Sequence, residues 1–181
     1  MVLHFTQQLH QALQEIEFIE HQEWIVHEPE EERTYHISDE ILGKYGDCKW
    51  AIVDLLNQKY GSALGSQFNL ALNGKFDLYN WINKNKQDEV AYFLNEAGSN
   101  CLNYSEFKAP YKFHLWLGEK GFIIGLEQKG KGFNAEAVHQ QKIKENEGAA
   151  FEFFRECNSK IFFDDSVNAK IIYLQFLPHL F

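Results

Sequence analysis

The sequence predicts an α+β protein: a two-layer sandwich in which a mixed β-sheet carries helices on one face, preceded by a helical extension. Two observations lead to this prediction. Segments 87–104 and 148–158 each repeat apolar residues at helical spacing, so each should bury one side against a sheet. Five short runs between residues 67 and 177 have the composition of strands and would supply that sheet.

The five predicted strands are residues 67–72, 112–117, 122–127, 160–163 and 170–177. The second and third flank Gly118-Glu119-Lys120-Gly121, which is typical of a hairpin turn. The last run is apolar on both faces, which predicts an internal strand. Residues 130–147 are polar, and we expect a loop with a short helix there.

A helical extension is predicted over residues 1–65, ahead of the sandwich domain at 66–181. Its first helix, 4–22, has apolar residues at helical spacing, and its second, 39–60, follows Ser38 as N-cap. Glycine–serine pairs at 61–62 and 65–66 mark the boundary. The stretch 24–36 allows two interpretations: two short strands around an acidic turn, or simply an acidic loop.

Composition restricts the class of protein. The chain has 181 residues, 45% of them hydrophobic and 15% aromatic, which is enough for a buried core. The formal net charge of −9 disfavours nucleic-acid binding. No apolar run is long enough to span a membrane, and no secretory signal pattern is present. Cys48, Cys101 and Cys157 fit reduced, mostly buried thiols, so we expect a cytoplasmic protein.

Segment 87–104 also carries a polar stripe that includes Tyr92, Glu96, Asn100 and Asn103. After the predicted hairpin comes Gln128-Lys129-Gly130-Lys131-Gly132-Phe133, then Gly148 at the start of a helix, and the last strand ends in Leu177-Pro178. This series resembles the GHKL family, the ATPase domains of histidine kinases, anti-sigma kinases, Hsp90 and MutL. Taken without the family, the stripe is an ordinary solvated helix face and the glycines are a surface turn.

The resemblance implies roles for particular residues. Asn100 would coordinate a Mg²⁺ ion that bridges the phosphates of ATP, and Glu96 would be the catalytic carboxylate that orients the attacking group. Gln128, Gly130, Gly132 and Gly148 would line the nucleotide site. Gln128 stands where the family has the aspartate that pairs with adenine, and the lid is short. We therefore expect weak or absent ATP binding.

The function that follows is a signal-transduction regulatory protein with a degenerate nucleotide site, acting through a protein partner. The alternatives are an active ATP-dependent protein kinase of the anti-sigma or histidine-kinase type, and a histidine phosphotransferase. In the last case His10 or His21, both on the predicted helix 4–22, would be candidate phosphate acceptors, although a solvated polar face explains them more simply. The apolar stripes of the extension predict a homodimer, or an extension folded back on its own domain.

Overall fold

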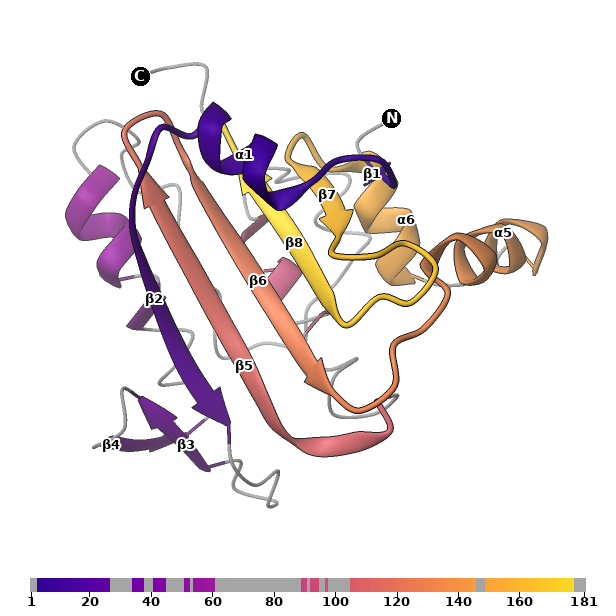
Figure 1. The fold of residues 1–181 in the computed structure, drawn as a ribbon, viewed down its shortest axis with the longest axis horizontal. Helices are drawn as coiled ribbons and strands as arrows, with labels where there is room; N and C mark the ends of the chain where they lie inside the picture. Colours follow the sequence, from indigo (N-terminus) through magenta and orange to yellow (C-terminus); the bar gives the residue numbers. More distant parts are fainter. Residues whose placement is uncertain are drawn as a thin grey trace.

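In a computed structural model, the chain forms an α+β fold built on one eight-stranded mixed sheet (Figure 1). The structure describes residues 3–26, 34–37, 41–44, 51–52, 54–60, 89–90, 92–94, 97, 105–145 and 149–177. The strands are β1 Leu3–His4, β2 Phe18–Val26, β3 Thr34–Ile37, β4 Ile41–Lys44, β5 Phe107–Gly118, β6 Phe122–Lys129, β7 Lys160–Phe163 and β8 Ile171–Phe176. Their order is β1-β7-β8-β6-β5-β2-β3-β4. Only the β1–β7 pair is parallel among these neighbours.

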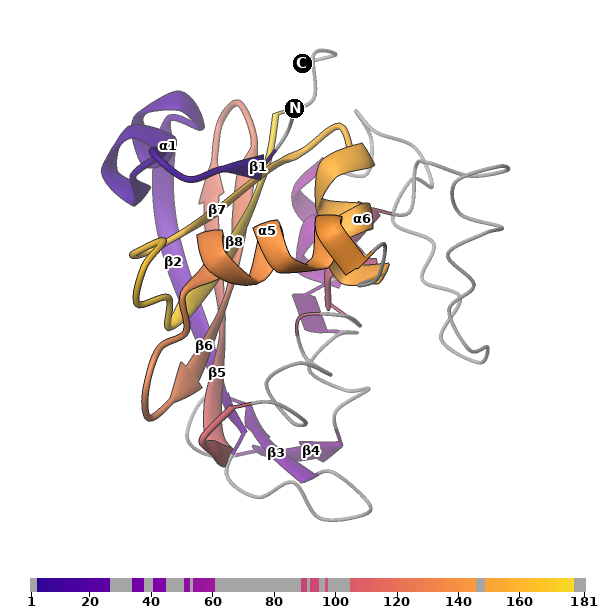
Figure 2. The ribbon, with the colours of Figure 1, turned by 90° about the vertical axis from the view of Figure 1, so that its right-hand side faces the viewer.

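The helices with assigned bounds are α1 Leu9–Glu15, α5 Ala135–Glu145 and α6 Ala149–Glu156. Helical residues also occur at 51–52 and 54–60, and at 89–90, 92–94 and 97. Viewed along the sheet edge, α6 and the helical residues 51–60 lie on one side of the sheet, and α1 lies on the other (Figure 2). The predicted two-layer sandwich with helices on one face is confirmed, with α1 as a small cover on the opposite face.

The main core lies between the sheet and the helices of the larger layer. Two ring contacts join the helical residues 89–97 to α6: Tyr92 to Phe153, with centroids 4.1 Å apart, and Phe93 to Phe154, at 6.4 Å. Sheet side chains complete this core: Phe113, Leu115, Leu117, Phe122, Ile124, Leu126, Ile161, Phe163 and Leu174. The two helices predicted on one face therefore share that face. Tyr92, assigned to the polar stripe, is buried.

A smaller core lies on the opposite face. Ala12 and Ile16 of the α1 region are fully buried there. They contact four side chains of the sheet: Trp116, Ile123, Phe162 and Tyr173. Because α1 is short, it covers only one end of this face (Figure 1). The remainder of the face, along β2, β5 and β6, carries polar side chains.

The predicted helix 4–22 is correct only over Leu9–Glu15, since His4 lies in β1 and the residues from Phe18 onward lie in β2. The chain turns at Glu17, whose φ is 52°, and β2 begins at Phe18. The β-favouring run Trp24-Ile25-Val26 closes the strand. Of the two interpretations of 24–36, the two strands are correct: β2 pairs with β3, antiparallel, with Ile25 opposite His36.

The predicted helix 39–60 is also shorter than expected. Residues 41–44 form β4, which pairs with β3, and the described helical residues start at 51. Four strands of the predicted extension join the same sheet as β5–β8. Ile52 and Leu56 lie fully buried in the main core. The predicted strand 67–72 and the glycine–serine boundary pairs lie outside the described residues.

The other predicted elements match closely. The hairpin at 112–127 is β5–β6, the loop after it contains α5, and β7 has the predicted bounds. The last strand is internal as expected, since β8 lies between β7 and β6. Cys157 is buried and free, whereas Cys48 and Cys101 lie outside the described residues. None of the helices in the described ranges has the length and hydropathy needed to cross a bilayer.

Candidate functional site

Of the six residues predicted to form a nucleotide site, the structure describes three. Gln128 lies near the end of β6, and Gly130 and Gly132 follow it on the connection to α5. Glu96, Asn100 and Gly148 lie outside the described residues, so the Mg²⁺ and catalytic roles assigned to them stay predictions. What can be examined is the backbone around the two glycines.

This glycine segment is bonded to the protein itself. The backbone N–H of Lys131 donates to a carboxylate oxygen of Glu106, 2.7 Å away, and the side-chain amide of Gln128 donates to the carbonyl of Lys131 at 2.9 Å. Gly130 has φ +98°, and a Cβ there would lie 2.6 Å from the Glu106 carboxylate. A Cβ on Gly132 would lie 2.4 Å from the carbonyl oxygen of Asn168.

The two glycines are therefore explained by close approach of the chain to itself. An approach to phosphate would need free backbone N–H groups, and the one on Lys131 is already bonded to a carboxylate. That carboxylate would repel a phosphate brought to the same N–H group. The Gln128 amide is directed at Lys131, not toward a ligand.

A second group of chemically active side chains lies on the sheet face opposite the main core. It consists of His21 and Glu23 on β2, His114 on β5 and Glu127 on β6. Glu23 lies directly across from His114 in the β2–β5 register, and His21 across from Trp116. Side chains two residues apart on a strand share a face, so β2 presents His21 and Glu23 together beside His114. We call His21, Glu23, His114 and Glu127 the sheet-face cluster.

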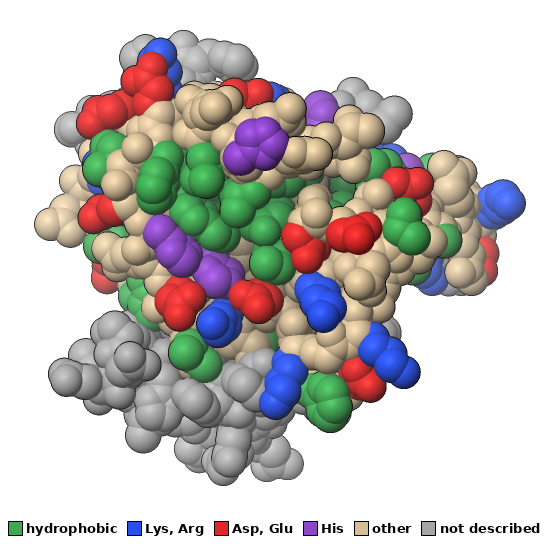
Figure 3. Space-filling model, in the orientation of Figure 1, with side chains coloured by type: hydrophobic (Ala, Val, Ile, Leu, Met, Phe, Trp, Pro, Cys, Tyr) green, Lys and Arg blue, Asp and Glu red, His purple; other side chains and the backbone are tan. Residues whose placement is uncertain are grey.

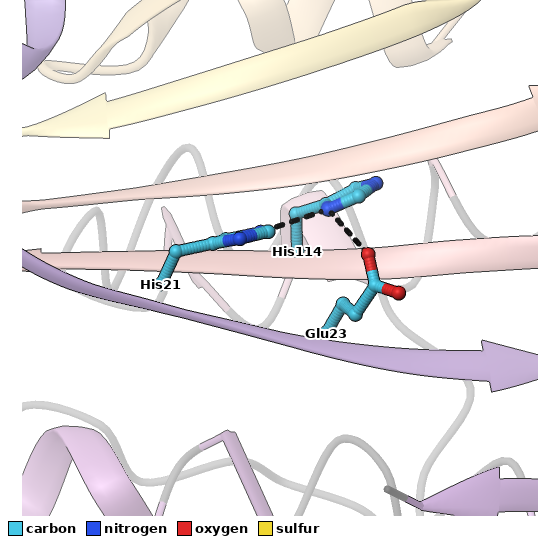
Figure 4. Close-up of side chains that lie close together, drawn as sticks. All are labelled: His21, Glu23 and His114. Carbon is cyan, nitrogen blue, oxygen red and sulfur yellow. Dashed lines mark hydrogen bonds and ion pairs between the residues drawn. The ribbon is translucent and has the colours of Figure 1, made fainter. Parts of the chain in front are cut away.

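The side chains of His21, Glu23 and His114 point toward one another (Figure 4). The Nε2 atom of His21 lies 3.0 Å from the Nδ1 atom of His114, and an oxygen of Glu23 lies 3.7 Å from the same Nδ1. On the other side of the His114 ring, Nε2 lies 2.8 Å from a Glu127 oxygen. One ligand atom each from His21, Glu23 and His114 lie within 4.8 Å of one another, a set of donors that could hold a metal ion.

The hydrogen bonds assign the proton positions on His114. Because a carboxylate only accepts, the Nε2 atom of His114 carries a proton and donates it to Glu127. In the neutral imidazole the Nδ1 atom is then an acceptor, and it takes the hydrogen bond from His21 Nε2–H. Burial, followed by the positive charge that His114 carries when protonated, lowers the pKa of His21, which favours the neutral form of His21.

The surroundings of the cluster are partly apolar. The indole of Trp116 is stacked with both imidazoles, with ring centroids 4.7 Å from His21 and 5.2 Å from His114. His114 is buried, while His21 and Glu23 are exposed. Figure 3 shows histidine side chains beside acidic and basic ones at the border of an apolar area on this face. Lys112 approaches Glu23 from the solvent side, with Nζ 3.6 Å from a carboxylate oxygen.

Sequence reasoning missed this cluster because it assigned His21 to a helix. On a helix, His21 and Glu23 would point in different directions; on a strand they share a face. The available signal was the pattern His-x-Glu within a run ending in Trp-Ile-Val, read at a period of two. The interpretation of His21 as a candidate phosphate acceptor on a helix is thus based on the wrong element, while His10 does lie on α1.

Comparisons with protein-family models, with curated proteins and with solved structures found no match to this chain.

Proposed function

We propose that this chain is a cytoplasmic regulatory protein of signal transduction, with a GHKL-like domain whose nucleotide site is degenerate, and that it acts by binding a protein partner. The observation that carries the proposal is the hydrogen bond from the Lys131 N–H to Glu106. It occupies the glycine segment with the protein's own carboxylate. A domain whose glycine segment is bonded to its own carboxylate is suited to binding a protein partner without turning over nucleotide.

The arrangement of elements supports the GHKL part of the proposal. The helical residues 89–90, 92–94 and 97 precede the β5–β6 hairpin, the glycine segment and α5 follow β6, α6 begins directly after Gly148, and β7 and β8 follow α6. Residues 89–97 and α6 pack on the same face, through Tyr92 and Phe153. The order of helix, two strands, glycines, helix and two strands is the one that the sequence motifs led us to expect.

The chemistry at Gln128 supports the degenerate site. An aspartate in this position would offer adenine a charged acceptor, whereas Gln128 is neutral and its amide is engaged with the Lys131 carbonyl. Loss of a charge-assisted hydrogen bond costs roughly 1.5–3 kcal/mol, or about ten- to a hundred-fold in affinity. Repulsion from Glu106 would add to that loss.

A calorimetric titration with Mg-ATP tests the proposal. We expect no binding at tens of micromolar nucleotide by the unaltered chain. The double variant Gln128→Asp with Glu106→Ala restores the charged acceptor and frees the Lys131 N–H, so it should gain measurable affinity. The matched control, Gln128→Asn with Glu106→Ala, frees the same N–H without the charge and should gain less. Micromolar binding by the unaltered chain would contradict the degenerate site, and no gain in the double variant would count against the GHKL-like interpretation.

A further inference from the structure

The sheet-face cluster carries an inference that goes beyond a regulatory role and does not depend on nucleotide. We propose that His21, Glu23 and His114 form a binding site for one divalent transition-metal ion of the zinc class, with Glu127 as the outer partner that orients His114. The ligand atoms are His21 Nε2, His114 Nδ1 and a carboxylate oxygen of Glu23. The argument rests on the geometry, the proton positions, the support from the sheet and the local charge.

The two imidazole nitrogens are spaced almost as a metal requires. Zinc bonds to histidine at about 2.0–2.1 Å, so two nitrogens in a tetrahedral site lie about 3.3–3.4 Å apart. His21 Nε2 and His114 Nδ1 are 3.0 Å apart, with ring planes within 15° of each other. A small outward swing of the exposed His21 ring therefore opens the pair to the required separation. The Glu23 oxygen, 3.7 Å from His114 Nδ1, is within a short side-chain rotation of the third position.

The proton on His114 is in the place that metal binding needs. Its Nε2–H donates to Glu127, so its Nδ1 lone pair faces His21 and Glu23. Metal-bound histidines commonly donate their second ring N–H to a carboxylate, which fixes the tautomer and raises the basicity of the ligand. Glu127 supplies that carboxylate at 2.8 Å. If His114 only accepted the hydrogen bond from His21, an uncharged acceptor for its Nε2–H would be sufficient in place of Glu127.

The backbone under the cluster is held by pairing on both sides. His114 lies opposite Glu23 on β2 and opposite Gly125 on β6, so it occupies an inner strand of the sheet. Its side chain is buried, and Trp116 stacks beside both imidazoles. Sites built on paired strands keep their ligands in place, because the ligand backbone does not have to be ordered when the ion arrives.

The local charge favours a cation. Around the two imidazoles, Glu23 and Glu127 contribute two negative charges and Lys112 contributes one positive charge. Lys112 pairs with one oxygen of Glu23 at 3.6 Å, which leaves the other oxygen on the His114 side. Two imidazoles and a carboxylate suit Zn²⁺, Co²⁺, Ni²⁺ or Cu²⁺, whereas Mg²⁺ and Ca²⁺ prefer oxygen ligands only. Since His21 and Glu23 are exposed, the fourth position of the ion opens to solvent.

The test is a titration of the untagged full-length chain with ZnCl₂ by calorimetry, alongside Co²⁺ absorption in the visible range. We expect one equivalent per chain with a dissociation constant on the order of micromolar or tighter, and the intense Co²⁺ bands of a four-coordinate site. Millimolar Mg²⁺ should not compete. His21→Gln and Glu23→Gln change exposed side chains and should each weaken binding at least about ten-fold.

Two further variants distinguish a specific metal site from nonspecific metal binding by surface histidines. Glu127→Gln leaves all three ligands in place but weakens the acceptor for His114 Nε2–H, and should lower the affinity about 10- to 100-fold. His10→Gln removes an exposed histidine on α1 and should leave the affinity unchanged. The proposal is overturned if the folded chain takes up neither Zn²⁺ nor Co²⁺ at 100-fold excess over about 1 µM protein. It is equally overturned if His21→Gln, Glu23→Gln and Glu127→Gln all bind like the unaltered chain.

Discussion

The hydroxyl of Ser159 donates a hydrogen bond of 2.6 Å to the carboxylate of Glu89, which lies 70 positions earlier in the chain. The same carboxylate accepts the backbone N–H groups of Asn158 and Ser159. Glu89 is only 2% exposed, so these three donors take the place of water around its carboxylate. It thereby fixes the helical residues 89–97 to the turn between α6 and β7.

Glu89→Gln should destabilise the fold strongly. The amide group would place N–H donors against N–H donors of the turn, leaving buried groups without partners. We expect a loss of about 2–4 kcal/mol in the free energy of unfolding, measured by urea denaturation. Ser159→Ala, which removes one donor only, should cost about 1–2 kcal/mol. Glu152→Gln, on the exposed side of α6, is the control and should change stability little.

Tyr60 fixes the β5–β6 turn from the helix layer. Its hydroxyl oxygen lies 2.7 Å from the Gly118 carbonyl and 2.9 Å from that of Gly121, and it accepts the Gly118 N–H at 3.2 Å. Tyr60→Phe removes the hydroxyl from these backbone groups, but the Gly118 N–H still donates to the Gly121 carbonyl at 2.9 Å, so we expect a loss of about 1–2 kcal/mol in the free energy of unfolding. A loss under about 0.5 kcal/mol would mean that the turn is held without this hydroxyl.

Tyr60 also predicts a response to alkali. Burial raises the pKa of its hydroxyl from 10.0 to about 12. The folded protein therefore keeps this proton more tightly than the unfolded chain, so the stability from Tyr60 is complete below pH 10 and is lost as the pH rises through this interval. The unaltered chain should lose stability more steeply than Tyr60→Phe between pH 10 and 12. Parallel curves of unfolding free energy against pH would contradict this expectation.

The burial of His139 predicts that the protein loses stability in acid. Its ring is buried between Phe5 and Phe151, with centroids 5.6 Å from each, and neither nitrogen has a hydrogen-bond partner within the described residues. Burial, followed by the charge of Arg155, lowers the pKa of this imidazole. Its stability contribution is thus present above about pH 6.5, the ordinary histidine pKa, and is lost as the pH falls below that value.

The measurement compares melting temperatures at pH 8 and pH 5. His139→Phe keeps an aromatic ring between Phe5 and Phe151 without a titrating group, and should reduce the drop in melting temperature on acidification. His10→Gln, at an exposed position of α1, should leave the drop unchanged. If His139→Phe loses as much stability on acidification as the unaltered chain, His139 is not responsible for the acid sensitivity.

The apolar stripes that predicted a homodimer include Ile52 and Leu56. Ile52 and Leu56 are fully buried within the chain's own core. Ile52→Glu should therefore unfold the protein, with loss of its circular dichroism and a cost of several kcal/mol, instead of separating two subunits. Light scattering of the unaltered chain still tests association: a concentration-dependent mass would show a dimer formed through another surface.

The local sequence pattern was sufficient to predict most elements in the second half of the chain. The run Ala149–Glu156 has a clear helical period, and β5 and β6 surround a recognisable turn. The same reasoning failed at β2, where Leu9, Leu13 and Ile16 start a helical stripe that Ile19 continues in the sequence. What ends the helix is the left-handed turn at Glu17 and the pairing of β2 with β5, a partner that no local window contains.

The sheet-face cluster could not be predicted for the same reason. His114 falls within a strand that the sequence did predict, and Glu127 falls at the end of the next one. Their approach to His21 depends on a register between β2 and β5 that side-chain types do not specify. Gly130 and Gly132 were predicted to line a nucleotide, whereas the groups that they approach, Glu106 and Asn168, are visible only in the fold.

The pairing of β2 with β5 has a consequence for how the chain assembles. His21 and His114, which meet across this pair, are 93 positions apart, whereas β5 and β6 are joined by a short turn. Closing a long loop costs more entropy than closing a hairpin, so we expect the β5–β6 hairpin to form first and β2 to add later. During synthesis β2 leaves the ribosome well before β5 has been made. The edge of β2 that pairs with β5 therefore stays unpaired until β5 is available. The contact between the two imidazoles therefore forms only when the first and second halves of the chain have joined.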